Sequence, residues 1–489
     1  MESIDVSSIV FKSAKQHAIA IQKRSIKAID LLEAYFEQID KFNPTINAVI
    51  WQDRKAAKEI AWQIDKETAK GNFRGPLHGV PMTVKESFNL SGAPTTWGNP
   101  KNIHNVATTD SDAVARLRSA GAIVFGKTNV PLDLVEWQTF NKIYGTTNNP
   151  WDQTRTPGGS SGGSAAALST GMSALEIGSD AGSSIRNPAH YCGVFGMKPT
   201  FKVVSSQGQC IEETHSESDI SVVGPLARTA EDLKLAFETI GGLRAIESTA
   251  FKNHLPADDR TKLSQFRIGL KLNDPESPVD NDYLDKLDKF VMNLENAGAK
   301  IIRNKLPDID NELHFMIYLK LVGASDSPHF TKDQINALTK GVRELNNDSV
   351  SRICGTRFEG LSLLHRDWIN LNKQRNKHRL AFDAYFEDID ILLAPATGTP
   401  AFNHDQKGPR YQRFLNINGK KYPEMAQLYW SGYSGVIGLP SVVGPIGLVR
   451  GLPVGYQAIA SHGRDFTALA FAEAVERELG GFIPPPLCI

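Results

Sequence analysis

Cysteine is scarce in this sequence, and its few copies are far apart. The 489 residues include four cysteines, at Cys192, Cys210, Cys354 and Cys488. Many zinc sites and redox motifs use cysteines in pairs separated by two residues, and disulfide-stabilised domains are usually small and rich in cysteine. The sequence therefore predicts a protein of a reduced compartment, the cytoplasm. We expect it to hold no metal and no cofactor.

An excess of either charge is also missing. Lysine and arginine together number 54, aspartate and glutamate also number 54, and the formal net charge is zero. Proteins that bind nucleic acids or anionic membranes commonly carry a basic surplus on the binding face. The balance of charge thus argues against both kinds of partner.

Long hydrophobic runs do not occur. The most apolar stretch, residues 435–449, is interrupted by Gly438, Pro440, Gly444 and Pro445. A membrane-spanning helix needs about 20 predominantly apolar residues without such breaks. The first 22 residues alternate polar and apolar side chains and lack the apolar centre of a secretory signal. We expect a soluble protein without a membrane span.

Glycine and serine, by contrast, are concentrated in one stretch, residues 157–186. A flexible linker can have such a composition. Here, however, the glycines are followed by the helix-forming residues Ala-Ala-Ala-Leu at 165–168. Ala-Leu-Glu-Ile at 174–177 then favours a strand. The stretch therefore indicates a folded unit with two serine clusters, not a linker.

The expected geometry brings the two serine clusters together. A helix over residues 164–172 rises roughly 13 Å, at about 1.5 Å per residue. A strand over residues 173–178 returns roughly 20 Å, at about 3.3 Å per residue. Residues 179–184 should therefore lie near Ser160, so that two glycine-rich loops with hydroxyl groups face each other.

A lysine follows a short apolar segment upstream. Residues 75–86 read GPLHGVPMTVKE, a turn followed by a strand that ends at Lys85. Most lysines at the end of a strand are solvated at the surface. The local pattern alone therefore assigns no function to Lys85.

Two motifs of other enzyme classes occur without the structure that they require. Residues 121–128, GAIVFGKT, match the P-loop pattern, but an apolar strand joins the glycines and Asn-Val-Pro at 129–131 prevents the phosphate-binding helix. Ser160 and Ser161 come close to the G-x-S-x-G elbow, but a loop precedes them instead of a strand. No histidine is placed as a base, and we interpret His190 as structural.

The order of expected elements is that of an α/β fold. A helical run over 8–42, which Asn43-Pro44 should end, is followed by strands and helices in alternation. Residues 309–386 are expected to be mostly helical. Because no repeat or linker divides the chain, we expect one large domain over residues 1–489.

Several segments together resemble the amidase-signature hydrolases along nearly the whole chain. They are GPLHGVPMTVKE, GAIVFGKTN, YGTTNNPWD, RTPGGSSGGS, GSDAGSSIRNP, CGVFGMKPT, GPLART and GLPVGYQ, in this order. The resemblance implies a mixed β-sheet core covered by helices on both faces. It also implies a signature core over about residues 75–242 and a variable region over about 310–435 that forms the substrate pocket.

The same resemblance implies the catalytic residues. Lys85 would be the catalytic lysine, Ser160 the serine that follows a cis peptide bond, and Ser184 the nucleophile. The oxyanion hole would be formed by the backbone N–H groups of Ala181, Gly182, Ser183 and Ser184. No cofactor is implied.

Three positions depart from the family pattern. Ser179 stands where threonine is common, and Ser183 stands where glycine is usual. Glu176 lies in a strand that is usually apolar. The hydroxyl of Ser183 is therefore a rival nucleophile one position before Ser184.

The chemistry of an amide explains why such residues are needed. An amide is a poor electrophile, so the attacking hydroxyl must be activated and the oxyanion stabilised. Lysine is a base only when it is neutral, and its ordinary pKa is about 10.4. Burial, and the positive end of the helix expected near Gly163, would both lower this pKa. Asp180 and Arg186 are expected to pair and to hold the loop.

The predicted function is hydrolysis of a non-peptide carboxylic acid amide through an acyl-enzyme on Ser184. Lys85 would act as the base through Ser160, and ammonia or an amine would be released. The expected partner is a small-molecule amide, and the active form a monomer or a homodimer.

The sequence leaves two alternative functions open. One is the glutamine-hydrolysing subunit of a tRNA-dependent amidotransferase, whose relatives carry an Arg-Tyr-Asp-Gly-like stretch; residues 323–329, GASDSPH, lack it. The other is a non-catalytic binding protein, which the presence of the lysine and both serines disfavours.

The walls of the substrate pocket are expected to come from the variable region and from several aromatic residues. Packing in the core would explain these aromatic residues equally well: Trp137 with residues 138–141, Tyr429, Trp430 and Tyr433.

Overall fold

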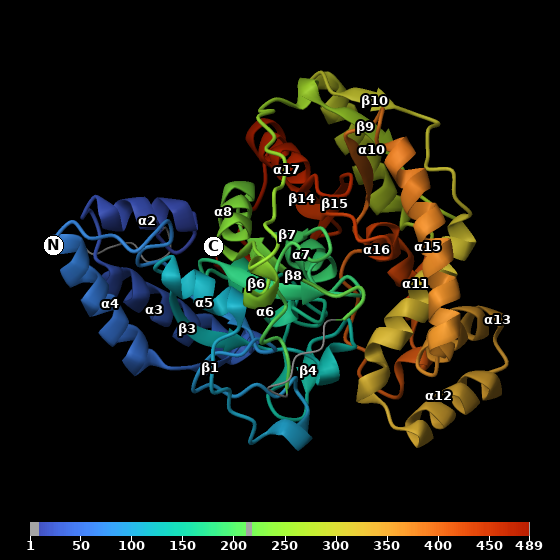
Figure 1. Cartoon of the computed structure of the whole chain (residues 1–489), viewed down its shortest axis with the longest axis horizontal. Helices are drawn as coiled ribbons and strands as arrows, with labels where there is room; N and C mark the ends of the chain where they lie inside the picture. Colours follow the sequence, from blue (N-terminus) through green and yellow to red (C-terminus); the bar gives the residue numbers. More distant parts are fainter. Residues whose placement is uncertain (1–8, 212–217, 489) are drawn as a thin grey trace.

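A computed structural model describes residues 9–211 and 218–488 (Figure 1). Within these residues, a mixed sheet of eight strands runs through the centre of the molecule. β10, β9 and β11 are parallel, and the other neighbouring strands are antiparallel. In the order of the sheet, the strands are β10 (Lys300–Ile302), β9 (Arg267–Leu270), β11 (Ile391–Pro395), β15 (Leu452–Ile459), β14 (Ser441–Val449), β7 (Phe195–Lys198), β8 (Val222–Ala227) and β6 (Glu176–Asp180).

A smaller sheet lies beside the edge strand β6. In sheet order its described strands are β1 (Val49–Gln52), β3 (Ile123–Thr128) and β2 (Pro81–Lys85). The N–H of Thr83 in β2 donates to the hydroxyl of Ser173, just before β6, over 2.9 Å. The carboxyl end of β2, which is Lys85, therefore lies next to β6. Short hairpins are formed by β4 (Phe140–Asn141) with β5 (Gly145–Thr146), and by β12 (Phe414–Ile417) with β13 (Lys420–Pro423).

Helices cover both faces of the large sheet. The ring of Tyr456 in β15 contacts Phe471 of α17 (Asp465–Leu479), with ring centroids 5.8 Å apart. The next residue, Gln457, accepts a hydrogen bond from Arg186 of α7 (Arg186–Cys192) over 2.9 Å. Successive side chains of a strand point to opposite faces, so α17 and α7 lie on opposite faces. The predicted mixed sheet with helices on both faces is confirmed.

The remaining α-helices fall into an N-terminal, a central and a C-terminal group (Figure 1). The described ones are α2 (Ala14–Gln22), α3 (Ala28–Ile46), α4 (Arg54–Ala69), α5 (Asp112–Ser119), α6 (Gly162–Ser169), α8 (Ala230–Ile240), α9 (Ala245–Ser248), α10 (Asn281–Asn296), α11 (Asn311–Asp326), α12 (Lys332–Glu344), α13 (Asp348–Val350), α14 (Thr356–Gly360), α15 (His365–Tyr385) and α16 (Leu428–Gly435). The mostly helical character predicted for residues 309–386 is confirmed.

The N-terminal helices differ from the expected single run. α2 and α3 are separated by residues 23–27, and α3 continues through Pro44, so the prediction that Asn43-Pro44 ends the run was wrong. Pro44 has no N–H to donate to the carbonyl four residues earlier, and the helix continues for only two residues beyond it. The helix ends at Ile46, and the capping residue Asn47 has a left-handed backbone with φ of 54°.

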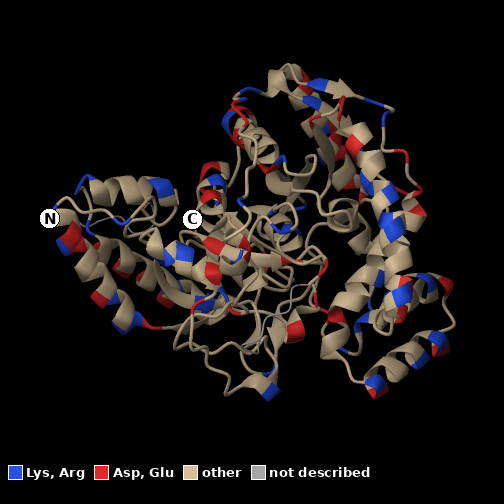
Figure 2. Cartoon of the chain, in the orientation of Figure 1, with Lys and Arg blue, Asp and Glu red and all other residues tan. Residues whose placement is uncertain are grey.

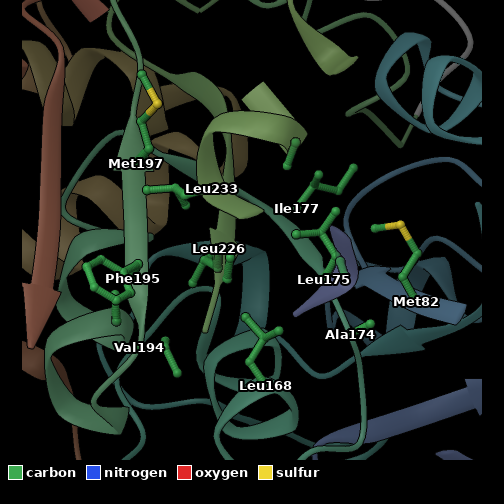
Figure 3. Close-up of a cluster of buried hydrophobic side chains, with 14 of the residues drawn as sticks. Met82, Leu168, Ala174, Leu175, Ile177, Val194, Phe195, Met197, Leu226 and Leu233 are labelled. Atoms are coloured by element: carbon green, nitrogen blue, oxygen red, sulfur yellow. The ribbon is translucent and has the colours of Figure 1, made fainter. Parts of the chain in front are cut away.

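The hydrophobic core continues from the small sheet into the large one. Figure 3 shows Met82 near Leu175 and Ile177, with Leu168, Leu226 and Leu233 packed beyond them. All of these side chains are buried. The packing fixes β2 against β6 and thereby positions Lys85.

Lysine and arginine are interspersed with aspartate and glutamate along the helices and loops of the fold (Figure 2). The distribution agrees with the zero net charge of the sequence. Among the residues that the structure describes, no helix is long and apolar enough to cross a membrane.

Candidate active site

The glycine- and serine-rich stretch forms the predicted helix and strand, with shifted ends. The helix expected over residues 164–172 is α6 (Gly162–Ser169), which begins two residues earlier and ends three residues earlier. β6 begins three residues later than expected and continues through Ser179. The late start arises because the hydroxyl of Ser173 closes a turn on the carbonyl of Leu175, over 2.7 Å. The strand extends further because Asp180 still pairs with Val222 of β8.

The two serine clusters meet through their backbones. The N–H of Ser161 donates to the carbonyl of Ser184 over 3.1 Å, so the predicted approach of the clusters is confirmed. The peptide bond between Gly159 and Ser160 is cis, as the resemblance implied. A Cβ on residue 159 would lie 2.4 Å from the carbonyl oxygen of Glu136. This close approach of two backbones requires glycine.

Lys85 extends from the end of β2 to both clusters. Its Nζ donates to the hydroxyl of Ser160 over 2.7 Å and to the hydroxyl of Ser179 over 2.9 Å. The side chain is fully buried, so Lys85 is not the solvated lysine that its local pattern suggests. The contact between Lys85 and Ser179 was not predicted. The only feature of the sequence that pointed to Ser179 was its hydroxyl group within the glycine-rich stretch.

Burial lowers the pKa of Lys85 to about 7, because the ammonium form loses its hydration. The carboxylates of Asp180 and Glu86 act in the opposite direction and raise this pKa. Near neutral pH a substantial fraction of Lys85 is therefore the neutral amine, which can accept a proton.

A second buried ionisable side chain lies close to β2. Glu176 accepts a hydrogen bond from the hydroxyl of Thr83, two residues before Lys85. Burial raises the pKa of Glu176 to about 8. The carboxyl is thus mostly neutral at pH 7 and adds little negative charge that would stabilise the ammonium form of Lys85.

A buried ion pair holds the loop that follows β6. Asp180 and Arg186 approach to 2.8 Å, and both side chains are fully buried, which confirms the predicted pairing. The carboxylate of Asp180 also accepts the N–H groups of Ser183 over 2.9 Å and Ile185 over 3.1 Å. The amide of Ser183, which was expected in the oxyanion hole, is therefore already engaged.

Two buried side chains orient the peptide groups of this loop. The hydroxyl of Tyr318 donates to the carbonyl of Ala181 over 2.6 Å, and the indole of Trp137 donates to that of Gly182 over 2.7 Å. In a trans peptide the N–H points away from the carbonyl, so Tyr318 also sets the direction of the N–H of Gly182. Within the described residues, the N–H groups of Gly182 and Ser184 have no hydrogen-bond partner.

A cavity of about 1250 Å³ opens above the site, and Ser160, Ser179, Ala181 and Ser184 lie in its wall. Further wall residues come from positions 321–329 and 360–368, inside the region expected to form the substrate pocket. Others come from positions 97–134, 206–211 and 218–221, which lie outside that region. The cavity joins the serines to a space large enough for a small organic substrate.

The two neighbouring serines of the loop differ in access. Ser184 lies in the cavity wall and is 8 % exposed, whereas Ser183 is fully buried. The backbone of Ser183 is left-handed, with φ of 73°. Its hydroxyl has no hydrogen-bond partner in the described part of the chain. The geometry favours Ser184 over Ser183 for contact with a substrate.

The aromatic residues considered as pocket walls belong to the core. Tyr429, Trp430 and Tyr433 are buried, and none of them is among the described residues that line the cavity. The hydroxyl of Tyr429 donates to Asp274 over 2.6 Å. Trp137 acts indirectly, through its bond to the loop after β6.

The P-loop-like segment and His190 are structural, as predicted. The P-loop-like segment is the buried strand β3, and its Lys127 donates to the hydroxyl of Thr95 over 3.0 Å. His190 is buried and accepts the N–H of Gly455 over 2.9 Å.

All four cysteines are free thiols. Across residues 9–211 and 218–488, no cluster of three or more histidine, cysteine or carboxylate side chains could hold a metal ion.

Comparisons with known proteins agree with this arrangement. A family model for amidases matches residues 30–469. A glutamyl-tRNA(Gln) amidotransferase subunit of Carboxydothermus hydrogenoformans is 30% identical, over 96% of this chain and 97% of the relative. An indoleacetamide hydrolase of Bradyrhizobium diazoefficiens is also 30% identical, over 96% of this chain and 86% of the relative.

Solved structures show the same fold. A crystal structure of an amidase matches with a TM-score of 0.77 at 26% identity, over 96% of this chain and 100% of the other. A bacterial aryl acylamidase of the amidase signature family matches with a TM-score of 0.79 at 22% identity, over 96% of each chain. The fold is thus that of enzymes that act on the carbon–nitrogen bonds of amides. Because the family model covers most of its length, the chain belongs to the amidase signature family.

Proposed function

We propose that the enzyme hydrolyses a small, non-peptide amide through an acyl-enzyme on Ser184. The hydroxyl of Ser184 attacks the amide carbonyl and passes its proton to Ser160, which passes its own proton to Lys85. When the carbon–nitrogen bond breaks, Lys85 returns the proton through Ser160 to the departing nitrogen. Water then cleaves the ester by the same relay and releases the carboxylic acid.

The observation that carries this proposal is the buried contact between Lys85 and Ser160. The Nζ of Lys85 and the Oγ of Ser160 are 2.7 Å apart, and Ser160 and Ser184 lie in the wall of the same cavity. Since burial brings the pKa of Lys85 to about 7, the lysine can accept a proton near neutral pH and give it back. This is the property that a proton relay requires.

The oxyanion hole is proposed to consist of the N–H groups of Ala181, Gly182 and Ser184. The amide of Ser183 is omitted because it donates to Asp180. Donors fixed before the substrate arrives stabilise the developing negative charge without further reorganisation. Tyr318 and Trp137 supply that rigidity through the carbonyls of the same loop.

Alanine substitutions separate the two candidate nucleophiles. Ser184→Ala is expected to reduce amide hydrolysis by roughly a thousandfold or more, because the attacking group is lost. Ser183→Ala is the matched control and should retain most of the activity. Initial rates with aliphatic, aromatic and N-acyl amides measure both. Retained activity in Ser184→Ala, with loss in Ser183→Ala, would move the nucleophile to Ser183.

A second candidate function is the glutaminase subunit of a tRNA-dependent amidotransferase. The relative from Carboxydothermus hydrogenoformans favours it, because the alignment covers nearly the full length of both chains. Residues 324–329, where the Arg-Tyr-Asp-Gly-like stretch is missing, line the cavity of this chain. Glutaminase activity of the purified chain alone, compared with that of the chain together with small partner proteins, distinguishes the two functions. Dependence on partners would favour the amidotransferase.

A further inference from the structure

The carboxylates in the wall of the active-site cavity differ in their pairing. Among the described lining residues they belong to Asp133, Asp219 and Asp326. Asp219 pairs with Arg375 over 3.0 Å, and Asp326 forms an ion pair with Arg357. In the part of the chain that the structure describes, Asp133 has no cationic partner. Asp133 therefore leaves an uncompensated negative charge in the wall.

An aromatic residue is joined to Asp133 through the backbone, and its ring lines the same cavity. The N–H of Asp133 donates to the carbonyl of Trp97 over 2.8 Å, and its carboxylate accepts a hydrogen bond from Asn99 over 2.8 Å. Trp97 and His329 both line the cavity, with ring centroids 5.4 Å apart. The face of an indole attracts a cation that lies within about 6 Å. A carboxylate and an indole in one cavity wall, on segments joined by a backbone hydrogen bond, are thus suited to an ammonium group.

The turn that carries Trp97 is held in place by buried contacts. The carboxylate of Glu86 accepts the N–H of Thr96 over 2.5 Å and the N–H of Trp97 over 2.9 Å. The indole N–H of Trp97 donates to the carbonyl of Ser87 over 3.3 Å. The aromatic face is therefore positioned before a substrate binds, which reduces the entropy lost on binding.

The described wall offers an anionic substrate no permanently charged cation; its basic side chains are those of His329 and His365. None of the described lining residues is lysine or arginine. Lys85 is buried beneath the wall and donates to Ser160 and Ser179. A substrate carboxylate would therefore lie in the field of Asp133 without a cationic partner of its own.

We propose that Asp133 determines specificity, and that the enzyme prefers amides that carry an ammonium group away from the scissile bond. Trp97 supplies the aromatic face for this group, and amides that end in a carboxylate are disfavoured. The inference rests on the proposed function, because the ammonium site lies in the cavity that holds Ser184. It adds the class of substrate to that function.

The test uses linear primary amides that differ only in their terminal group, which is ammonium, methyl or carboxylate, over a range of chain lengths. At the best length, kcat/KM of the ammonium amide should exceed that of the methyl amide by about tenfold, and the carboxylate amide should be the poorest. Calorimetric binding of the three amides to Ser184→Ala should follow the same order.

Substitution of the carboxylate assigns the preference to one residue. Asp133→Asn keeps the shape of the side chain, and asparagine tolerates the left-handed backbone of this position, where φ is 49°. It should bring the ammonium and methyl amides within about twofold of each other and leave the methyl amide almost unchanged. Asp133→Glu should restore part of the preference. Asp348→Asn, at an exposed position outside the cavity, controls for the loss of one charge.

The outcomes separate this inference from the proposed function. Hydrolysis of the methyl amide without an ammonium preference overturns the role of Asp133 and leaves the acyl-enzyme proposal standing. A preference that persists in Asp133→Asn also overturns it. If none of the amides is hydrolysed but Ser184→Ala binds them in the stated order, the hydrolytic proposal fails and the ammonium site is supported. Binding without that order overturns the site.

Discussion

At the scale of single residues, the site depends on a buried lysine whose lowered pKa makes its neutral form available near pH 7. Lys85 is fully buried, and its hydrogen bonds go to two hydroxyl groups instead of a carboxylate. A hydroxyl compensates a buried ammonium less than a carboxylate would. Glu176, close to β2, is mostly neutral at pH 7 because burial raises its pKa to about 8. These environments make an amine base available near neutral pH.

The pH dependence of the rate follows from this lowered pKa. Lys85 accepts a proton only as the neutral amine, and its pKa is about 7, so kcat/KM should fall as the pH drops below about 7 and should level off above it. The measurement is kcat/KM from pH 5.5 to 9 with an uncharged amide, so that the substrate does not titrate. A rate that is constant over this range would contradict a lysine base.

The roles of single residues could be predicted only in part. Asp180 and Arg186 were paired from their spacing, because short separations restrict what two charges can contact. Lys85 could be assigned only through the resemblance, since its own segment is typical of a surface lysine. The engagement of the Ser183 amide and the contact of Ser179 depend on tertiary placement, which no local pattern encodes.

At the scale of elements, the connection from β6 to α7 is organised by one carboxylate. Asp180 accepts hydrogen bonds from the backbone of the loop and pairs with Arg186. Arg186 in turn donates to the carbonyl of Ser431 over 2.9 Å and to Gln457 of β15. The loop that carries Ser184 is thus connected to α16 and to the centre of the large sheet.

Removal of the charge of Asp180 should therefore affect both stability and rate. Asp180→Asn leaves a buried guanidinium without its partner, so the free energy of unfolding should fall by about 3–5 kcal/mol. The rate should fall as well, because the loop amides lose their fixed orientation. Urea denaturation and kcat measure the two effects. Glu295→Gln, in the exposed pair with Arg303, is the control and should change little; equal effects of both substitutions would contradict this account.

Some ends of helices and strands could not be predicted from the local sequence. The apolar strand β3 and the amphipathic helices followed from periodicity. The start of β6 could not be predicted, because the turn closed by Ser173 delays it. The end of α3 was misplaced because the helix continues two residues past its proline, to the left-handed cap at Asn47.

At the scale of the whole molecule, the proposed proton relay depends on the contact between two sheets. Lys85 ends a strand of the small sheet, whereas Ser179 belongs to the edge strand of the large one. The side chains around Met82 and Ile177 fill the space between the sheets (Figure 3). The α/β class could be predicted from the order of elements. The packing of β2 against β6 could not, because it joins segments about 90 residues apart through nonlocal contacts.

Covalent capture of the nucleophile tests the central claim most directly. A fluorophosphonate reacts with an activated serine hydroxyl and leaves a stable adduct, which peptide mapping by mass spectrometry assigns to one residue. The account predicts a single adduct on Ser184, which is absent from Ser184→Ala, retained in Ser183→Ala and formed more slowly below pH 7. An adduct on Ser183 or on another serine, or labelling of Ser184 at an unchanged rate in Lys85→Ala, would contradict it.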